Sequence, residues 1–297
     1  MRLWCFGNAA GSGKGGGVAH SKTRLLRLTT PLAGAVTLLL AGIVVTDAAD
    51  CPRQDVLGTS RVLEVDAKAH PRVGSNSFRE TLPLADHEVV LTFDDGPRPP
   101  STQKVLAALA KECVRATFFL VGKSSAKSPE LVRRIAAEGH TIAHHSWSHT
   151  MMSKMTFEQA KKDIDRGIAA DETALKGASA QSPPSRFFRF PYFDSSPAML
   201  EFLRSRGMVV FGADLSAGDW ENLTPEQELK TVTERLEVAS KGIILLHDAQ
   251  TRTAAMMPAF LRYLHENGYR IVHLVPAGPI ESNAEVTPTA SRSSSRK

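Results

Sequence analysis

The chain has 297 residues, of which 42% are hydrophobic and 23% are charged, an ordinary composition for a globular protein with a substantial core. Its formal net charge is +5, but residues 1–49 hold five Lys/Arg and one Asp/Glu, which leaves 31 basic and 30 acidic residues beyond position 49. A balance of +1 gives no electrostatic support for a nucleic-acid partner, so we expect none.

The first 49 residues have the pattern of a secretory signal peptide with a long basic region. Arg24 and Arg27 precede an apolar run from Leu32 to Val45, and the small residues at 46–49 suit cleavage. The run is short for a membrane span, although an uncleaved signal anchor is the alternative. We therefore expect an exported protein, periplasmic or extracellular, that meets a membrane only if the anchor stays uncleaved.

Beyond the signal, composition divides the chain into three parts. Residues 50–85 carry Pro, Gly, Ser and scattered charge with little periodicity, which predicts an N-terminal extension. Residues 86–276 form one domain, and residues 277–297, rich in Ser, Thr and Ala, predict a disordered tail. Cys51 and Cys113 both follow the signal and either form a disulfide or leave Cys113 as a buried thiol.

Within the domain, strand-like and helix-like segments alternate. Short apolar runs predict seven strands, at 89–93, 116–121, 141–143, 187–190, 208–211, 243–246 and 271–275. Helical spacing and capping residues predict helices at 102–111, 129–138, 157–175, 197–206, 225–239 and 254–266. This alternation predicts an α/β fold with a parallel sheet buried by helices, either an open doubly wound sheet or a barrel.

The strand at 89–93 runs into two adjacent carboxylates, Asp94 and Asp95, before Gly-Pro turns the chain. Two neighbouring acids at the end of a buried strand repel each other and lose hydration. A fold tolerates such a pair where a cation neutralises one member or where a raised pKa is useful. A solvated turn is the alternative interpretation.

His145 and His149 are four residues apart, so on a helical turn both imidazoles would project from one face and share a metal ion. With one carboxylate of the Asp pair, they make a three-ligand site with open positions for water and substrate. These ligands suit Zn²⁺ or non-haem Fe(II). Ser146 stands where a zincin protease needs Glu, which argues against that chemistry.

Polar residues also follow the later strands, and active sites of such folds lie at the carboxyl ends of the strands. Arg189 could hold the second aspartate ionised, or form an ordinary structural ion pair. His247 is a candidate general acid oriented by Asp219, although a lone histidine there could equally be a core residue. A small apolar pocket could be walled by Trp220, Tyr192 and Leu245.

Five stretches together resemble the ordered motifs of the polysaccharide deacetylases, the NodB-type family also called carbohydrate esterase family four. They are TFDDGP (92–97), HSWSH (145–149), RFPY (189–192), DW (219–220) and LLH (245–247). The resemblance implies a distorted (β/α) barrel of about seven parallel strands. It also implies metal-dependent removal of N-acetyl groups from polysaccharides that contain N-acetylglucosamine, such as peptidoglycan or chitin oligomers, with Zn²⁺ as the expected metal.

Carried over by position, the resemblance makes Asp94 the catalytic base and gives the metal to Asp95, His145 and His149. Arg189 then supports the base. The same resemblance leaves open an O-acetyl esterase of the xylan type and a non-catalytic carbohydrate-binding protein.

The remaining motifs imply the groups that act on the acetyl carbonyl and on the leaving amine. The backbone N–H of Tyr192 would help bind the oxyanion, and His247, tuned by Asp219, would protonate the amine. Two features complicate this assignment. His144 stands where the family often has Asn and offers a competing imidazole, and Asp214 competes with Asp219.

Overall fold

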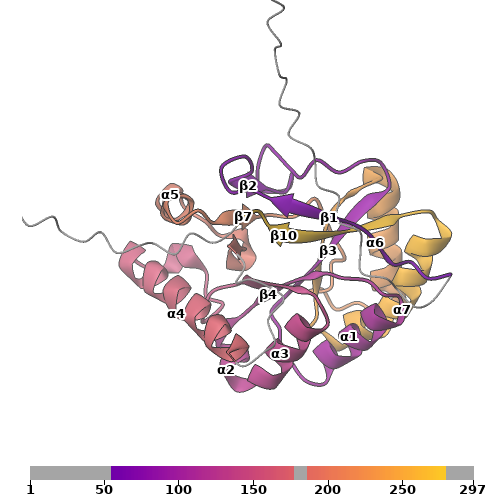
Figure 1. Cartoon of the computed structure of the whole chain (residues 1–297), viewed down its shortest axis with the longest axis horizontal. Coiled ribbons are helices and arrows are strands. Elements are labelled where there is room, and N and C mark those ends of the chain that lie inside the picture. Colours follow the sequence, from indigo (N-terminus) through magenta and orange to yellow (C-terminus); the bar gives the residue numbers. More distant parts are fainter. Residues whose placement is uncertain (1–54, 177–185, 279–297) are drawn as a thin grey trace, which may run out of the picture. The chain divides into compact units, whose positions relative to one another are not determined.

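The computed structural model describes residues 55–176 and 186–278 (Figure 1). The expected signal peptide, residues 50–54 of the expected extension and residues 279–297 of the expected tail lie outside these ranges. Cys113 is disulfide-bonded. Cys51, its expected partner, lies outside the described ranges. Within the described ranges, no helix is both long enough and apolar enough to cross a membrane.

The described residues contain ten strands, seven α-helices and two short 3₁₀ helices. The strands are β1 (Thr59–Val65), β2 (Arg72–Val73), β3 (Glu88–Asp94), β4 (Thr117–Leu120), β5 (Thr141–His144), β6 (Phe187–Phe188), β7 (Val209–Phe211), β8 (Leu215–Ser216), β9 (Gly242–His247) and β10 (Arg270–Pro276). The α-helices are α1 (Ser101–Lys111), α2 (Gly122–Lys127), α3 (Pro129–Ala137), α4 (Phe157–Leu175), α5 (Pro197–Ser205), α6 (Pro225–Ala239) and α7 (Thr251–Glu266). The 3₁₀ helices are η1 (Met152–Lys154) and η2 (Pro191–Phe193).

The sequence expectation for the sheet is confirmed, and the structure adds to it. All seven expected strands are present, and every pairing among the described strands is parallel. The sequence did not predict three further strands, β1, β2 and β8. Strands β2 and β8 have only two residues each, and β1 is half-exposed and so lacks a continuous apolar run. Two of the three lie in the segment expected to be an extension, and there they pair with β10 and β7.

β3 is the centre of the sheet, with β4 on one side and β9 on the other. Beyond β4 come β5, β6, β7 and β2, and beyond β9 comes β8. No strand pair joins β7 to β8 in the described ranges, so the curved sheet is open along this seam. Asp214 lies in the seam and accepts hydrogen bonds from the backbone N–H of Ser75 and Ile243 and from the Thr81 hydroxyl.

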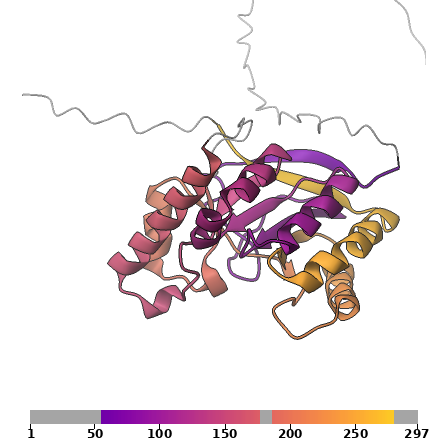
Figure 2. The ribbon, with the colours of Figure 1, turned by 90° about the horizontal axis from the view of Figure 1, so that it is seen from below.

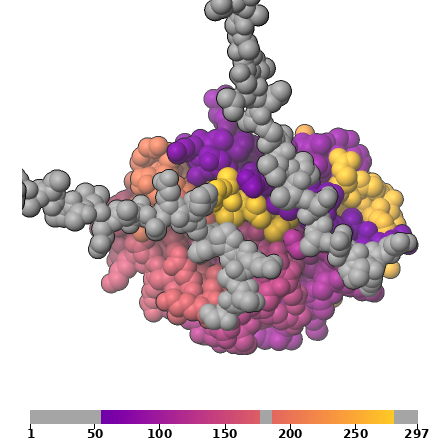
Figure 3. All heavy atoms as spheres, in the orientation of Figure 1, coloured from indigo at the N-terminus to yellow at the C-terminus, as the bar shows by residue number. Residues whose placement is uncertain are grey.

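The concave face of the curved sheet has its own core. Buried apolar side chains from nine of the ten strands meet there, among them Val90, Phe119, Phe187 and Ile243. β10 pairs with only the first two residues of β3 and then passes the amino end of β5, where Leu274 accepts a hydrogen bond from Thr141. The β1–β10 pair therefore closes the amino end of the barrel, and the carboxyl end stays open for polar residues. Figure 3 shows the indigo and yellow segments of this pair side by side on one face.

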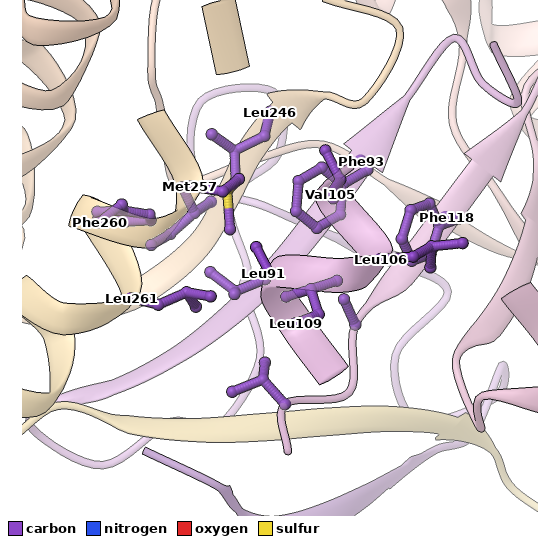
Figure 4. Close-up of a cluster of buried hydrophobic side chains, with 14 of the residues drawn as sticks. Leu91, Phe93, Val105, Leu106, Leu109, Phe118, Leu246, Met257, Phe260 and Leu261 are labelled. Carbon is purple, nitrogen blue, oxygen red and sulfur yellow. The ribbon is translucent and has the colours of Figure 1, made fainter. Parts of the chain in front are cut away.

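Helices cover the convex face. Figure 2 shows α4, α3, α1 and α7 side by side along it, and α6 packs against α7. α1 and α7 bury Val105, Leu106, Met257 and Phe260 against strands β3, β4 and β9, a cluster that Figure 4 shows in close-up. Burying such side chains stabilises the fold by roughly 1.5–3 kcal/mol each, which fixes the spacing of the strands that carry the polar residues.

Candidate active site

Adjacent strands bring the polar strand-end residues together. Asp94, the last residue of β3, is the register partner of His247 at the end of β9. Two strands away, His145 follows β5, and its backbone N–H donates to the Leu120 carbonyl at the end of β4. Arg189 follows β6, and its N–H donates to the carbonyl of residue 144. The carboxyl ends of parallel strands thus gather the expected site at one end of the barrel.

Asp95, His145 and His149 form a group that could hold a metal ion. One ligand atom from each lies within 4.8 Å of the others, and the described ranges contain no other such group. His149 Nε2 is 3.0 Å and His145 Nε2 is 3.5 Å from Asp95 Oδ1. That oxygen is buried and receives no well-aligned hydrogen bond from any residue that the structure describes, so its lone pair is available.

The protonation states favour metal binding. His145 Nδ1 is 2.7 Å from the Arg189 carbonyl, which can only accept, so Nδ1 carries the proton and Nε2 keeps its lone pair. Burial lowers the pKa of His145, which keeps the ring neutral. Burial alone would raise the pKa of Asp95, but His149, His145 and His247 together hold it well below its usual range. The set therefore offers one carboxylate and a neutral imidazole of defined tautomer.

The two histidines converge without the helical turn that the sequence predicted, and that expectation was wrong. No helix spans 145–149, and Ser146 and His149 have φ angles of 65° and 57°. Asp95 also has a positive φ, 74°. Non-glycine residues adopt this conformation rarely and cluster at functional sites. The loop geometry aims both imidazoles at Asp95, a result that spacing alone could not foresee.

Asp94 has partners of its own. Its Oδ1 is 2.7 Å from Nη1 of Arg189, and both side chains are almost completely buried. The guanidinium also donates to Thr92 Oγ1 at 2.9 Å and to the Gly212 carbonyl at 2.7 Å, and it stacks 4.2 Å from the Phe119 ring centroid. Burial lowers the pKa of Arg189 from a very high starting value, and Asp94 opposes this shift, so the guanidinium remains charged.

His247 is paired with Asp219, as the sequence predicted. Its Nδ1 is 2.8 Å from Asp219 Oδ1, and its backbone N–H donates to Oδ2 at 2.6 Å. Burial on its own would lower the pKa of His247, but the hydrogen bond and charge of Asp219 raise it to about 9. Asp214, the competing aspartate, lies in the seam of the barrel instead, where backbone and hydroxyl groups occupy it.

Exposed aromatic rings flank the polar group. The Tyr192 ring is 63% exposed and lies 4.8 Å from the His149 ring, and Tyr192 takes a φ of 58° in η2. The Trp220 ring is 56% exposed and stands perpendicular to the His247 ring. Leu245, the third expected wall residue, is buried in β9.

The structure also shows supporting residues that the sequence did not reveal. His144, the competing imidazole, is turned away from the metal group, and its Nδ1 lies 2.7 Å from Asp171 of α4. Thr253 of α7 donates to Asp219 at 2.8 Å. The regular spacing of Asp163, Gly167 and Asp171 along α4 is the one signal that the sequence carries, but the spacing alone does not identify the residues that they contact.

A parallel α/β barrel with a two-histidine, one-aspartate group and a separate Asp–Arg pair at its carboxyl end is the architecture of a hydrolase site. Comparison with known proteins makes the assignment specific. The sequence profile of the polysaccharide deacetylase family matches residues 82–211. A chitooligosaccharide deacetylase of Sinorhizobium fredii is 30% identical over 196 residues, which cover 62% of this chain and 88% of that protein.

Two further relatives agree. A peptidoglycan-N-acetylglucosamine deacetylase of Listeria monocytogenes is 31% identical over 185 residues, 62% of this chain but 37% of its own length. The solved structure of a Bdellovibrio bacteriovorus peptidoglycan deacetylase superposes with a TM-score of 0.66 at 32% identity, covering 79% of this chain and 65% of that one. The chain belongs to the polysaccharide deacetylase family, and the family and fold that its motifs predicted are confirmed.

Proposed function

We propose that this protein hydrolyses N-acetyl groups of N-acetylglucosamine-containing polysaccharide, such as peptidoglycan or chitin oligomers, with the help of a divalent metal. Water and the amide are consumed, and acetate and a free amine are released. The observation that carries the proposal is that the two adjacent carboxylates at the end of β3, Asp94 and Asp95, lie in different surroundings. Asp95 converges with His145 and His149 within 4.8 Å, while Asp94 pairs with Arg189 at 2.7 Å through Oδ1 and keeps Oδ2 3.7 Å from His145 Nε2.

The three expected ligands fit a metal ion, because Asp95 Oδ1 is buried and accepts no well-aligned hydrogen bond from a described residue, His145 presents its Nε2 lone pair, and His149 Nε2 lies 3.0 Å from the same oxygen. Two imidazoles and one carboxylate favour Zn²⁺, with Fe(II) as the alternative. When bound, the metal would supply Lewis acidity toward the acetyl carbonyl and a water of lowered pKa.

The other groups of the site then have distinct tasks. Asp94 accepts the proton of the attacking water, and the hydrogen bond from Arg189 fixes the position of this carboxylate. The backbone N–H of Tyr192 contributes to oxyanion binding. His247, protonated because Asp219 raises its pKa, donates a proton to the leaving amine. The exposed rings of Tyr192 and Trp220 flank the sugar.

Polysaccharide substrates of this class lie outside the cytoplasm, which agrees with the secretory pattern of residues 1–49. We therefore also infer export. An O-acetyl esterase acting on xylan would use the same groups, so substrate choice must be measured. A non-catalytic carbohydrate-binding role fits less well, because Asp94 and His247 add nothing to simple binding.

The test is acetate release from N-acetylglucosamine oligomers by the purified protein, before and after chelation and after addition of Zn²⁺. We expect release that chelation abolishes and Zn²⁺ restores. Acetylated xylan is the parallel substrate. Release from xylan alone would replace the proposal with the O-acetyl esterase, and no release from either substrate by the metal-loaded protein would contradict it.

A further inference from the structure

Behind the His247–Asp219 pair lies a second buried carboxyl group, Glu228, in the first turn of α6. Glu228 is completely buried, and neither of its oxygens receives a hydrogen bond from a described residue. A buried ionised carboxylate without donors is costly, so such a group is retained either neutral or for a purpose.

The groups that face Glu228 come from every element packed around it. Burial raises its pKa to about 7, and the charge of Asp219 adds to that rise. The charges of Arg252 on α7 and His247 on β9 oppose it, and the Thr253 hydroxyl lies beside the carboxyl group. Glu228 therefore holds its proton in most molecules below about pH 7, and a neutral carboxyl is a hydrogen-bond donor.

Thr253 determines where that proton can go. Its single hydroxyl hydrogen is donated to Asp219 Oδ2 at 2.8 Å. Asp219 also accepts from His247, through the backbone N–H on Oδ2 and through Nδ1 on Oδ1. Thr253 is completely buried, so water does not reach its oxygen. The Thr253 hydroxyl has no hydrogen left for Glu228 and can only accept from it.

We propose that Glu228 is a positioning residue that stays neutral and donates its carboxyl proton to Thr253 Oγ1. A directed series of hydrogen bonds then runs from Glu228 through Thr253 to Asp219, which fixes Asp219 as an acceptor for His247 Nδ1–H. The consequence is a single ring orientation for His247, with Nδ1–H on Asp219 and Nε2 turned toward Asp95, 4.0 Å from Oδ2. The relay serves any substrate that His247 protonates.

Two pairs of variants test the relay by kcat. Glu228→Gln keeps a donor toward Thr253 and is expected to retain most of the activity, whereas Glu228→Ala is expected to lose about tenfold, the value of a hydrogen bond to a charged network. Thr253→Ser keeps the hydroxyl and Thr253→Val removes it, with the same contrast expected. KM should change little, because neither residue touches substrate. Glu234→Ala, exposed on the same helix, is the matched control.

Non-additivity separates a relay from two unrelated structural roles. If Glu228 acts through Thr253, the double variant Glu228→Ala/Thr253→Val loses no more kcat than Thr253→Val alone. Losses that multiply, or a wild-type kcat in Glu228→Ala, would overturn the proposal. The Thr253→Ser and Thr253→Val contrast gives the same decision if alanine at 228 prevents folding.

A measurement without substrate keeps this inference independent of the proposed deacetylase activity. The Nδ1–H proton of His247 should give a downfield NMR resonance in the metal-free protein, because it is hydrogen-bonded to Asp219 and shielded from water. We expect Glu228→Gln and Thr253→Ser to keep that resonance, and Thr253→Val to shift or broaden it. An unchanged resonance in Thr253→Val would contradict the relay even in a protein that releases no acetate.

Discussion

Asp94 and Asp95 are neighbours in the chain and both lie near His145 Nε2, 3.7 Å from Asp94 Oδ2 and 3.5 Å from Asp95 Oδ1, but their other partners differ. The backbone of Asp95 turns into the left-handed region at φ 74°, which sends its side chain toward the two histidines. Asp94 stays in the strand, and its side chain meets Arg189. This geometry supports the proposed roles of Asp95 as a metal ligand and Asp94 as a base, which the motif resemblance implied but the local sequence Asp-Asp alone does not distinguish.

The separation of roles predicts different losses in single variants. Asp94→Asn should keep Zn²⁺ affinity, because Asp94 is not in the ligand group, but should lose about 10²–10⁴-fold in kcat, the usual contribution of a general base. His149→Ala should lose both metal affinity and activity. Zn²⁺ affinity is measured by competition with a chromogenic chelator. Full activity in Asp94→Asn would remove Asp94 from the base role.

The buried Arg189–Asp94 ion pair predicts that removing Arg189 alone destabilises the fold, and that removing the charge of Asp94 as well restores most of the lost stability. Arg189→Met leaves the Asp94 carboxylate buried and unpaired, which should lower the free energy of unfolding by about 3–5 kcal/mol. Adding Asp94→Asn removes the orphaned charge and should recover most of that loss, while activity stays absent. Denaturant unfolding of the two single variants and the double variant gives the answer. Additive losses would show that Arg189 stabilises through packing on Phe119 rather than through Asp94.

At the scale of elements, the sequence predicted where the main strands end but not the geometry of the loops that follow them. Long apolar runs, such as those of β3 and β9, predict buried strands, and the polar residues that follow them predict the end of the sheet at which the site lies. The two-residue strands β2 and β8 carry too little pattern to be seen, and the left-handed residues of the histidine loop have no code in the sequence. Asp214 and Asp219 were distinguishable only once the sheet was assembled, because each follows a short strand.

Helix α4 holds the loop that carries the metal histidines, and it does so with three residues spaced four apart. Asp163 accepts hydrogen bonds from the backbone N–H of Trp147 and Ser148, each at 3.2 Å. One turn later Gly167 packs directly on the backbone of Ser146. A further turn on, Asp171 binds His144. One helix face therefore fixes both ends of the loop.

Gly167→Ala tests this contact, because a Cβ at position 167 would lie 2.4 Å from the Ser146 carbonyl carbon and 2.7 Å from the Trp147 nitrogen. On an isolated helix the change would stabilise by about 1 kcal/mol. Here we expect a lower unfolding temperature and at least a tenfold loss of Zn²⁺ affinity, on the order of other outer-shell changes at metal sites. Asp163→Asn keeps its size and should lose less. Unchanged Zn²⁺ affinity in Gly167→Ala would show that the loop holds its shape without α4.

At the scale of the whole molecule, the two ends of the barrel bury titratable groups of opposite kind. Near the site, Glu228 and Asp248 are buried with pKa values raised to about 7. At the amino end, burial lowers the pKa of His140 to about 3 and that of His273 to about 4. The carboxyls favour folding more as pH falls and the histidines favour it less, so the two sets offset each other in the wild-type protein.

Replacing His273 should make the effect of buried histidines on the pH dependence of stability measurable. In the unfolded chain a histidine binds a proton below about pH 6.5, whereas folded His273 stays neutral down to about pH 4, so acid stabilises the unfolded state between these values. Replacing His273 by Gln removes the proton linkage. The free energy of unfolding of wild type should fall by about 2 kcal/mol more than that of His273→Gln when the pH is lowered from 7.5 to 5. Any loss from packing is common to both pH values and cancels in this difference.

Urea unfolding of the two proteins at pH 5 and 7.5 measures that difference, with His265→Gln, at an exposed position on α7, as the matched control. Thr141 donates its hydroxyl proton to the Leu274 carbonyl, so His273 Nε2 must donate to Thr141 Oγ1, and the amide group of Gln can replace that donor. The same free-energy difference at both pH values would show that His273 takes up its proton in the folded state as readily as in the unfolded chain. Because His273 lies where β10 closes the barrel and far in sequence from the metal residues, the expected change belongs to the fold and should leave Zn²⁺ affinity at neutral pH unaltered.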